Sequence, residues 1–323
     1  MTRNMKIILL SAISFVIIVV GVLGFIGNYF YNISINPKTE RPFFDNNPDL
    51  SLAVPAMQMG EQVEKDREAA KQWVEQAPHS DVTLTSYDGL KLRGYEYRQE
   101  QASARWVIIA HGYMGYGKQM AVPSMKFHQQ GYNVLLVDLR GHGESEGQYI
   151  GMGWHDRLDM VGWINQIMNH DSNAEIVLYG VSMGGATVMM TSGEDLPSNV
   201  KAIVEDCGYT SAYDEFSYQL KRLFNLPSFP IMTASNAVVN LRAGYDLKEA
   251  SALDQVAKSK TPMLFIHGDA DTFVPYEMVQ QLYDAAQVEK DLFIVKDAGH
   301  GGAYLAGEAY WNKVWAFTNK YMS

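Results

Sequence analysis

The N-terminal part of the chain carries a long, uninterrupted run of apolar residues. Between Ile7 and Gly27 the sequence contains no charged residue and no proline. At about 1.5 Å per residue, a helix of this length spans the hydrocarbon core of a bilayer, which is roughly 30 Å thick. A cleaved signal peptide is the alternative, but its apolar region is usually about 7–15 residues and ends at a small-residue cleavage site, which is missing here. We therefore predict a transmembrane helix over residues 7–27, preceded by a short tail of residues 1–6.

The residues on either side of this run give an expected orientation. Arg3 and Lys6 adjoin the apolar run on its N-terminal side, whereas Lys38 and Arg41 lie farther from it on the other side. Lys and Arg favour the cytoplasmic flank of a membrane helix, so we expect a cytoplasmic N-terminus and an extracellular main domain at the cell membrane. The aromatic residues at 29–31 stand where an interfacial aromatic belt would lie.

Residues 28–79 are expected to form a spacer followed by a stalk helix. The spacer is rich in prolines, which oppose regular structure: Pro37, Pro42, Pro48 and Pro55. Asn46-Asn47-Pro48 favours a turn. Residues 61–76 have helical composition, with Val63, Ala70, Trp73 and Val74 as candidate buried positions. The sequence leaves open whether this helix packs on the following domain or stands in solvent.

From residue 80 onward, short apolar runs alternate with helical segments. Residues 82–84 and 90–92 alternate apolar and polar side chains around Asp88-Gly89, which is typical of a β-hairpin. The later runs are rich in branched side chains, as strands buried on both faces are: 106–110, 134–137, 176–179, 202–204, 263–266 and 292–295. This alternation predicts an α/β domain over residues 80–323, with a mostly parallel sheet covered by helices on both faces.

Composition and charge narrow the range of partners. The chain has 323 residues, of which 47% are hydrophobic, and its formal net charge of −10 opposes binding to nucleic acid. Cys207 is the single cysteine, so no disulfide within the chain and no thiolate zinc site can form. No other metal motif is evident, and we expect neither a metal nor a cofactor.

Candidate chemistry lies at the predicted carboxyl ends of the strands, where parallel sheets gather their functional groups. Gly180–Gly184 matches G-x-S-x-G, a tight strand-to-helix turn that exposes a nucleophilic serine, here Ser182. The pentapeptide alone is weak evidence, but an apolar strand precedes it and a small-residue helix follows it. We therefore predict that Ser182 is a catalytic nucleophile.

A serine hydroxyl needs a base to take its proton, and the base needs a carboxylate to orient it. His300 lies in a glycine-rich loop after the last strand and is the predicted base. Asp271 is the preferred carboxylate, because the segment that follows it leads directly into the next helix. Asp269 and Asp206 stay open as alternatives.

Acyl transfer from a serine also needs N–H donors for the tetrahedral oxyanion. The backbone N–H of Met183, just after Ser182, is one predicted donor. The other is the backbone N–H of Tyr113, which follows His111-Gly112 in the loop after the strand at 106–110. We expect the His111 side chain to brace this loop rather than to transfer a proton.

Several segments together resemble the motifs of α/β-hydrolases related to the serine aminopeptidase S33 group: His111-Gly112, Asp138–Ser145, Gly180–Gly185, His267–Pro275 and Gly299-His300. The resemblance runs from about residue 82 to the C-terminus. With the N-terminal helix, the chain is similar to single-pass, membrane-anchored bacterial hydrolases of that superfamily. The resemblance implies an α/β-hydrolase fold with a Ser182, Asp271 and His300 triad, and it places a short helical cap at about residues 208–245.

We therefore expect a serine hydrolase that cleaves an ester through an acyl-enzyme, as a carboxylesterase does. An S33-type peptidase, an acyltransferase and a thioesterase are alternatives that the motifs do not separate. The expected partners are a small-molecule ester or amide and the lipid bilayer. The cap region is rich in aromatic residues, which either line an apolar substrate pocket or pack the cap on the core.

One motif argues for a different chemistry. Gly112–Lys118 fits the first seven positions of a phosphate-binding loop, G-x-x-x-x-G-K. Gln119 stands where a Ser or Thr must ligate Mg²⁺, so we do not expect nucleotide binding.

Overall fold

The computed structural model of the chain describes residues 2–40 and 60–323. Some features predicted for the spacer lie outside the described residues: Arg41, Pro42, the turn at Asn46-Asn47-Pro48, and Pro55.

Eight strands form one sheet in the order β1-β2-β4-β3-β5-β6-β7-β8. Their bounds are β1 Ser80–Thr85, β2 Lys91–Tyr97, β3 Arg105–Ala110, β4 Asn133–Val137, β5 Glu175–Val181, β6 Val200–Asp206, β7 Met263–Gly268 and β8 Lys290–Val295. β2 runs antiparallel to both β1 and β4, and the remaining neighbours are parallel. The predicted mostly parallel sheet is confirmed.

Successive strand residues point to opposite sides of the sheet, so the apolar strands give it two apolar faces. Helices cover both of these faces. Ile108 of β3 belongs to one hydrophobic core and its neighbour Ile109 to the other. The first core packs against α5 Asp156–His170, α6 Met183–Thr191, α9 Ala252–Val256 and α10 Tyr276–Ala285. The second packs against α3 Glu61–Gln76, α4 Ala121–Gln129 and α11 Glu308–Thr318. The domain also contains two short 3-10 helices, η2 Gly117–Met120 and η3 Ala303–Ala306.

The helix α3 lies on the domain. Its Ala70 and Val74 are buried, and the Tyr97 hydroxyl donates a 2.7 Å hydrogen bond to the carbonyl of Val74. Lys126 of α4 pairs with Asp66 at 2.5 Å. Of the two interpretations that the sequence leaves open, the packed helix is the one observed.

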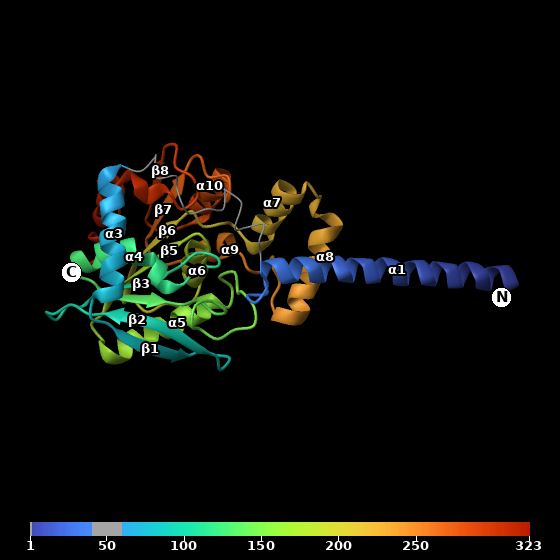
Figure 1. Ribbon diagram of the computed structural model, residues 1–323, viewed down its shortest axis with the longest axis horizontal. Coiled ribbons are helices and arrows are strands. Elements are labelled where there is room, and N and C mark those ends of the chain that lie inside the picture. The colour runs from blue at the N-terminus through green and yellow to red at the C-terminus, as the bar shows by residue number, and fades with distance from the viewer. Residues whose placement is uncertain (1, 41–59) are drawn as a thin grey trace.

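The N-terminal helix α1 spans Arg3–Ser34, so it extends beyond the predicted 7–27 at both ends. It projects from the domain with the N-terminus at its tip, as Figure 1 shows. Within the described residues it is the one helix long and apolar enough to cross a membrane, with a mean hydropathy of 2.9 over its most apolar window. Most of its side chains up to Phe25 are exposed, and Gly27 is the first buried residue of the helix.

The last turns of α1 pack against two helices of the region after β6. These are α7 Ala212–Phe224 and α8 Ser228–Ala243, which we call the cap helices, and they lie around the point where α1 meets the domain (Figure 1). α8 crosses α1 so closely at Gly27 that a Cβ there would lie 2.6 Å from the Ala234 carbonyl oxygen. Tyr31 is 3% exposed beneath Arg242, whose guanidinium lies 4.0 Å from the ring centroid.

This packing corrects one expectation from the sequence. Of the aromatic residues at 29–31, Tyr31 is buried and Phe30 stacks edge-on against Phe224 of α7, with ring centroids 5.5 Å apart. These two rings therefore contact protein.

Candidate active site

Ser182 occupies a strained turn between β5 and α6. Its φ of 58° and ψ of −121° lie in a region that residues with a side chain rarely adopt. The flanking glycines make the turn sterically feasible, because a Cβ on Gly180 would lie 2.1 Å from the Gly184 carbonyl oxygen. A Cβ on Gly184 would lie equally close, 2.1 Å, to the carbonyl oxygen of Ala110. The tight turn thus holds the hydroxyl at the carboxyl edge of the sheet.

The structure brings the three predicted side chains into one hydrogen-bonded line. His300 Nε2 lies 2.8 Å from Ser182 Oγ, and His300 Nδ1 lies 2.7 Å from Asp271 Oδ2. With Nδ1–H donating to the carboxylate, Nε2 is left to accept the serine proton. The arrangement is that of a nucleophile, a general base and an orienting carboxylate.

Asp271 is buried but well supplied with donors. Its Oδ1 accepts hydrogen bonds from the backbone N–H groups of Phe273 and Val274, at 2.8 and 2.9 Å. Burial pushes the pKa of Asp271 upward, but His300 and His267 outweigh burial and hold this pKa well below its usual range. The carboxylate is therefore charged across the pH range in which His300 has to act as a base.

The two alternative carboxylates lie elsewhere. Asp269 accepts a 2.6 Å hydrogen bond from the backbone N–H of Asp297. Asp206 accepts from the hydroxyl of Tyr310 at 2.8 Å, and burial raises the Asp206 pKa to about 6. Of the three candidates, Asp271 is the one hydrogen-bonded to His300.

The predicted oxyanion donors flank Ser182. Met183 is the first residue of α6, so its N–H belongs to the helix N-terminus, where N–H groups have no carbonyl partner within the helix. On the other side the loop after β3 passes close by, since a Cβ on Gly112 would lie 3.4 Å from the Ser182 Cβ. Tyr113 follows Gly112 directly in this loop. Both positions thus lie next to the nucleophile.

His111 holds this loop in place. Its Nδ1 lies 2.7 Å from the Gly112 carbonyl oxygen, and its Nε2 accepts a 3.0 Å hydrogen bond from the backbone N–H of Leu139. Burial lowers the pKa of His111 to about 4, so the ring is neutral at physiological pH. This geometry agrees with a bracing role.

The phosphate-loop resemblance has a structural explanation. The backbone N–H of Gly117, which would face a phosphate in such a loop, donates a 2.6 Å hydrogen bond to Asp138 Oδ1. Asp138 Oδ2 accepts a second bond, of 2.9 Å, from the N–H of Glu144. A carboxylate therefore lies where an anion would bind, and repels it.

One group in the described part of the chain has the spacing of metal ligands. It consists of Cys207, Asp271 and His300, whose ligand atoms all lie within 4.8 Å of one another. Burial raises the pKa of the Cys207 thiol well above its usual value, and a protonated thiol is a poor metal ligand. The other two side chains already bond each other, so the residues do not fit a metal centre.

An apolar pocket of about 830 Å³, part of it open to solvent, lies over Ser182. Its walls include the cap helices, the loop that carries Tyr113, the last turns of α1 and Phe273 of the loop after β7. The wall residues of α1 are Phe30, Tyr31, Ile33 and Ser34, and Ile35 follows directly after the helix.

Sequence reasoning missed three parts of this site. The first is His267, whose Nε2 lies 3.3 Å from Asp271 Oδ2. Its place at the end of a strand, directly before Gly268, was the signal that could have identified it. Glu215 of α7 lies in the pocket wall, 3% exposed, although nothing in the local pattern marks it as buried. The third is the contribution of α1 to the pocket.

Comparison with known proteins places the chain among serine hydrolases. A family model described as X-Pro dipeptidyl-peptidase (S15 family) matches residues 48–244, and one described as serine hydrolase (FSH1) matches residues 219–301. The protein YqkD of Bacillus subtilis is 26% identical over 235 residues, which cover 71% of this chain and 75% of YqkD. A Saccharomyces cerevisiae membrane protein, YNL320W, is 23% identical over 237 residues, covering 73% of this chain and 78% of that protein.

Among solved structures, the Pyrococcus furiosus esterase Pf2001 is similar in fold. The TM-score is 0.62 at 22% sequence identity, and the alignment covers 82% of this chain and 96% of the esterase. At this identity the likeness concerns the fold alone.

Proposed function

The chain belongs to the X-Pro dipeptidyl-peptidase (S15) family within the α/β-hydrolase superfamily, and on that premise we propose that it cleaves carboxylic esters through an acyl-enzyme on Ser182. The superfamily predicted from the sequence is confirmed, and so is its nature as a serine hydrolase. The S33 subgroup stays a prediction. The observation that carries the proposal is the line from Ser182 through His300 to Asp271, which opens into an apolar pocket.

The proposed reaction proceeds in two halves. His300 Nε2 takes the proton of the Ser182 hydroxyl as its oxygen attacks the ester carbonyl. The N–H groups of Met183 and Tyr113 stabilise the oxyanion, each by about 3 kcal/mol in comparable enzymes. His300 then returns the proton to the leaving alcohol. In the second half His300 deprotonates a water, which attacks the acyl-enzyme. The bond to Ser182 Oγ then breaks, the acid leaves, and His300 returns the proton to Ser182.

The electrostatics of the pocket favour an ester over a peptide with a free amino terminus. Glu215 is an acidic residue of the pocket wall, and burial raises its pKa to about 8, opposed by a hydrogen bond from Gln219. Because burial disfavours the charged form of this carboxyl, the wall attracts an ammonium group less than an ionised carboxylate would. An uncharged ester fits such a wall better.

The family description favours a second candidate, the release of an X-Pro dipeptide. The two candidates are separated by p-nitrophenyl esters of graded chain length and by an Ala-Pro p-nitroanilide. We expect the esters to be hydrolysed, and we expect fluorophosphonate labelling and turnover to be lost together in Ser182→Ala. Activity on the Ala-Pro substrate without ester hydrolysis would overturn the proposal.

The helix α1 serves as the membrane anchor in this proposal, with the N-terminus in the cytoplasm and the catalytic domain outside. Its length and mean hydropathy support the anchor, and the yeast relative is described as a membrane protein. The orientation rests on Arg3 and Lys6, which precede the apolar part of the helix.

A further inference from the structure

The helix α1 takes part in the pocket as well as in the proposed anchor. Phe30 and Ile33 line the space above Ser182 together with Leu220 and Phe224 of α7 and Met232 of α8. The helix end is also bonded to the domain: the Tyr113 hydroxyl donates to the Ser34 carbonyl at 2.7 Å, and the Ile150 N–H donates to the Ile35 carbonyl at 2.8 Å. The wall is therefore fixed relative to the nucleophile.

The length of the exposed part of α1 places this wall relative to a bilayer. From Ile7 to Phe25 the helix measures about 28 Å, close to the roughly 30 Å of a hydrocarbon core. Phe25 is 74% exposed, whereas Gly27 is buried against α8. Phe30 lies about 7.5 Å farther along the axis, which is about the depth of one headgroup layer. With α1 placed as the proposed anchor, the pocket begins at the depth of the headgroup layer.

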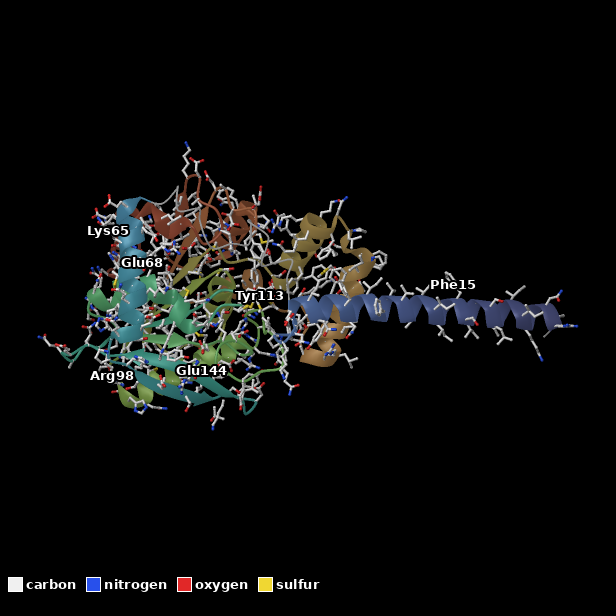
Figure 2. The ribbon with its side chains drawn as sticks, viewed as in Figure 1. Phe15, Lys65, Glu68, Arg98, Tyr113 and Glu144 are labelled. Carbon is white, nitrogen blue, oxygen red and sulfur yellow. The ribbon has the colours of Figure 1, made fainter. Side chains whose placement is uncertain are left out.

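The surface of the cap agrees with this position. Phe229 and Leu241 on α8 are 77% and 85% exposed, and α8 is the helix that crosses α1 at Gly27. In Figure 2 Phe15 extends from the protruding part of α1 and Tyr113 lies where that helix meets the domain. The labelled residues Lys65, Glu68 and Arg98 lie at the opposite end of the domain, and Glu144 lies between them and Tyr113 (Figure 2). Apolar side chains are therefore exposed on the cap next to α1, beside the basic residues Lys221 and Arg242.

We infer that the substrate is an acyl ester embedded in the membrane, which enters the pocket directly from the bilayer that holds α1. The acyl chain lies against Phe30, Phe224 and Met232, and its ester carbonyl reaches Ser182. This inference rests on the proposed ester hydrolysis and names the substrate class. The last turns of α1 then form part of the acyl-binding wall, and substrate and enzyme share one membrane.

The first test compares two ways of presenting the same ester. The full-length protein is reconstituted in phosphatidylcholine vesicles, and 4-methylumbelliferyl palmitate is placed either in those vesicles or in separate ones. We expect hydrolysis to be about tenfold faster when enzyme and ester share a vesicle, because transfer through water is avoided. Equal rates in the two arrangements would overturn the inference.

The second test uses the pocket wall. Phe30→Trp adds bulk to the wall, and Phe25→Trp makes the same change on an exposed position of the same helix. The readout is the ratio of palmitate to butyrate turnover for the 4-methylumbelliferyl esters. We expect this ratio to fall about tenfold in Phe30→Trp and to stay unchanged in Phe25→Trp. An unchanged ratio in Phe30→Trp would contradict the inference.

Two controls separate the possible failures. Fluorophosphonate labelling of Ser182 reports whether Phe30→Trp is folded, and Phe224→Trp replaces it, with the same expected ratio, if labelling is lost. Butyrate hydrolysis that survives Ser182→Ala would refute the proposed function itself. Butyrate hydrolysis that depends on Ser182, together with equal rates in the two vesicle arrangements, would refute the membrane substrate alone.

Discussion

The hydroxyl of Tyr113 donates a 2.7 Å hydrogen bond to the backbone carbonyl of Ser34, the last residue of α1. Tyr113 follows the glycine that passes Ser182, and its N–H is the proposed second oxyanion donor. One side chain therefore connects the end of the N-terminal helix to the loop beside the nucleophile.

This bond leads to a first prediction. Tyr113→Phe removes the hydroxyl but keeps the backbone N–H, so the proposed oxyanion donor remains. A net hydrogen bond contributes about 0.5–1.5 kcal/mol, and we expect kcat/KM for p-nitrophenyl butyrate to fall by about two- to tenfold. A loss of several thousandfold would show that the side chain takes part in the chemistry directly.

The contact between His300 and Asp271 leads to a second prediction. Asp271→Asn removes the charge that orients the imidazole, and we expect kcat to fall by about 10⁴-fold, as in other serine hydrolases. Asp269→Asn is the matched control, since Asp269 bonds a backbone N–H and not His300; it should stay within about threefold of wild type. Equal losses in the two variants would contradict the assignment of the carboxylate.

The buried carboxyl of Glu215 leads to a prediction about how stability depends on pH. Burial raises its pKa to about 8, above the ordinary value of 4.5, so the folded state holds a proton that the unfolded chain releases. This contribution to stability is fully present below the unfolded pKa and is lost as the pH rises through the folded pKa. We expect Glu215→Gln to reduce the fall in the thermal midpoint between pH 5 and pH 9. An unchanged slope would mean that Glu215 is ionised in the folded protein.

The crossing of α1 and α8 can be tested at a glycine. Gly27→Ala places a methyl group 2.6 Å from the Ala234 carbonyl oxygen, and we expect a loss of about 1–3 kcal/mol, measured as a lower thermal midpoint. Gly24→Ala, on the same helix with no atom within 4 Å of the added Cβ, is the control and should cause no loss. A tolerated Gly27→Ala would argue against the close crossing.

The proposed orientation predicts which residues are reached from outside the cell. A cysteine in Lys65→Cys, on the exposed side of α3, should react with a membrane-impermeant maleimide in intact cells. A cysteine in Arg3→Cys should react after the cells are opened. Cys207 is buried and adds little background. The opposite pattern of labelling would reverse the orientation.

Much of this molecule follows from local sequence signals. Apolar runs predict strands such as β3 and β5. Gly180 and Gly184 are required at their positions because a Cβ at either would clash. The order of Ser182, Asp271 and His300 follows from the fold that the motifs resemble. These features depend on residues close in sequence or on a fixed topology.

The environment of the site depends instead on distant contacts. Phe30 and Tyr31 suit a lipid interface and a protein wall equally well, because both surroundings accept aromatic rings, and only packing on α7 and α8 decides between them. Glu215 sits in a helix of ordinary amphipathic composition, so its burial depends on how α7 lies over Ser182. Neither the packing of Phe30 and Tyr31 nor the burial of Glu215 could be predicted from the pattern of apolar and polar residues.

The joint between α1 and the domain has a practical consequence for anyone preparing this enzyme. Trimming the N-terminal helix to ease purification would also take away Phe30 to Ile35 and with them one side of the cavity over Ser182. A shortened protein keeps Ser182 but lacks part of the pocket wall, so its relative activities on different substrates do not represent those of the intact enzyme. Screening is therefore best done on the intact chain.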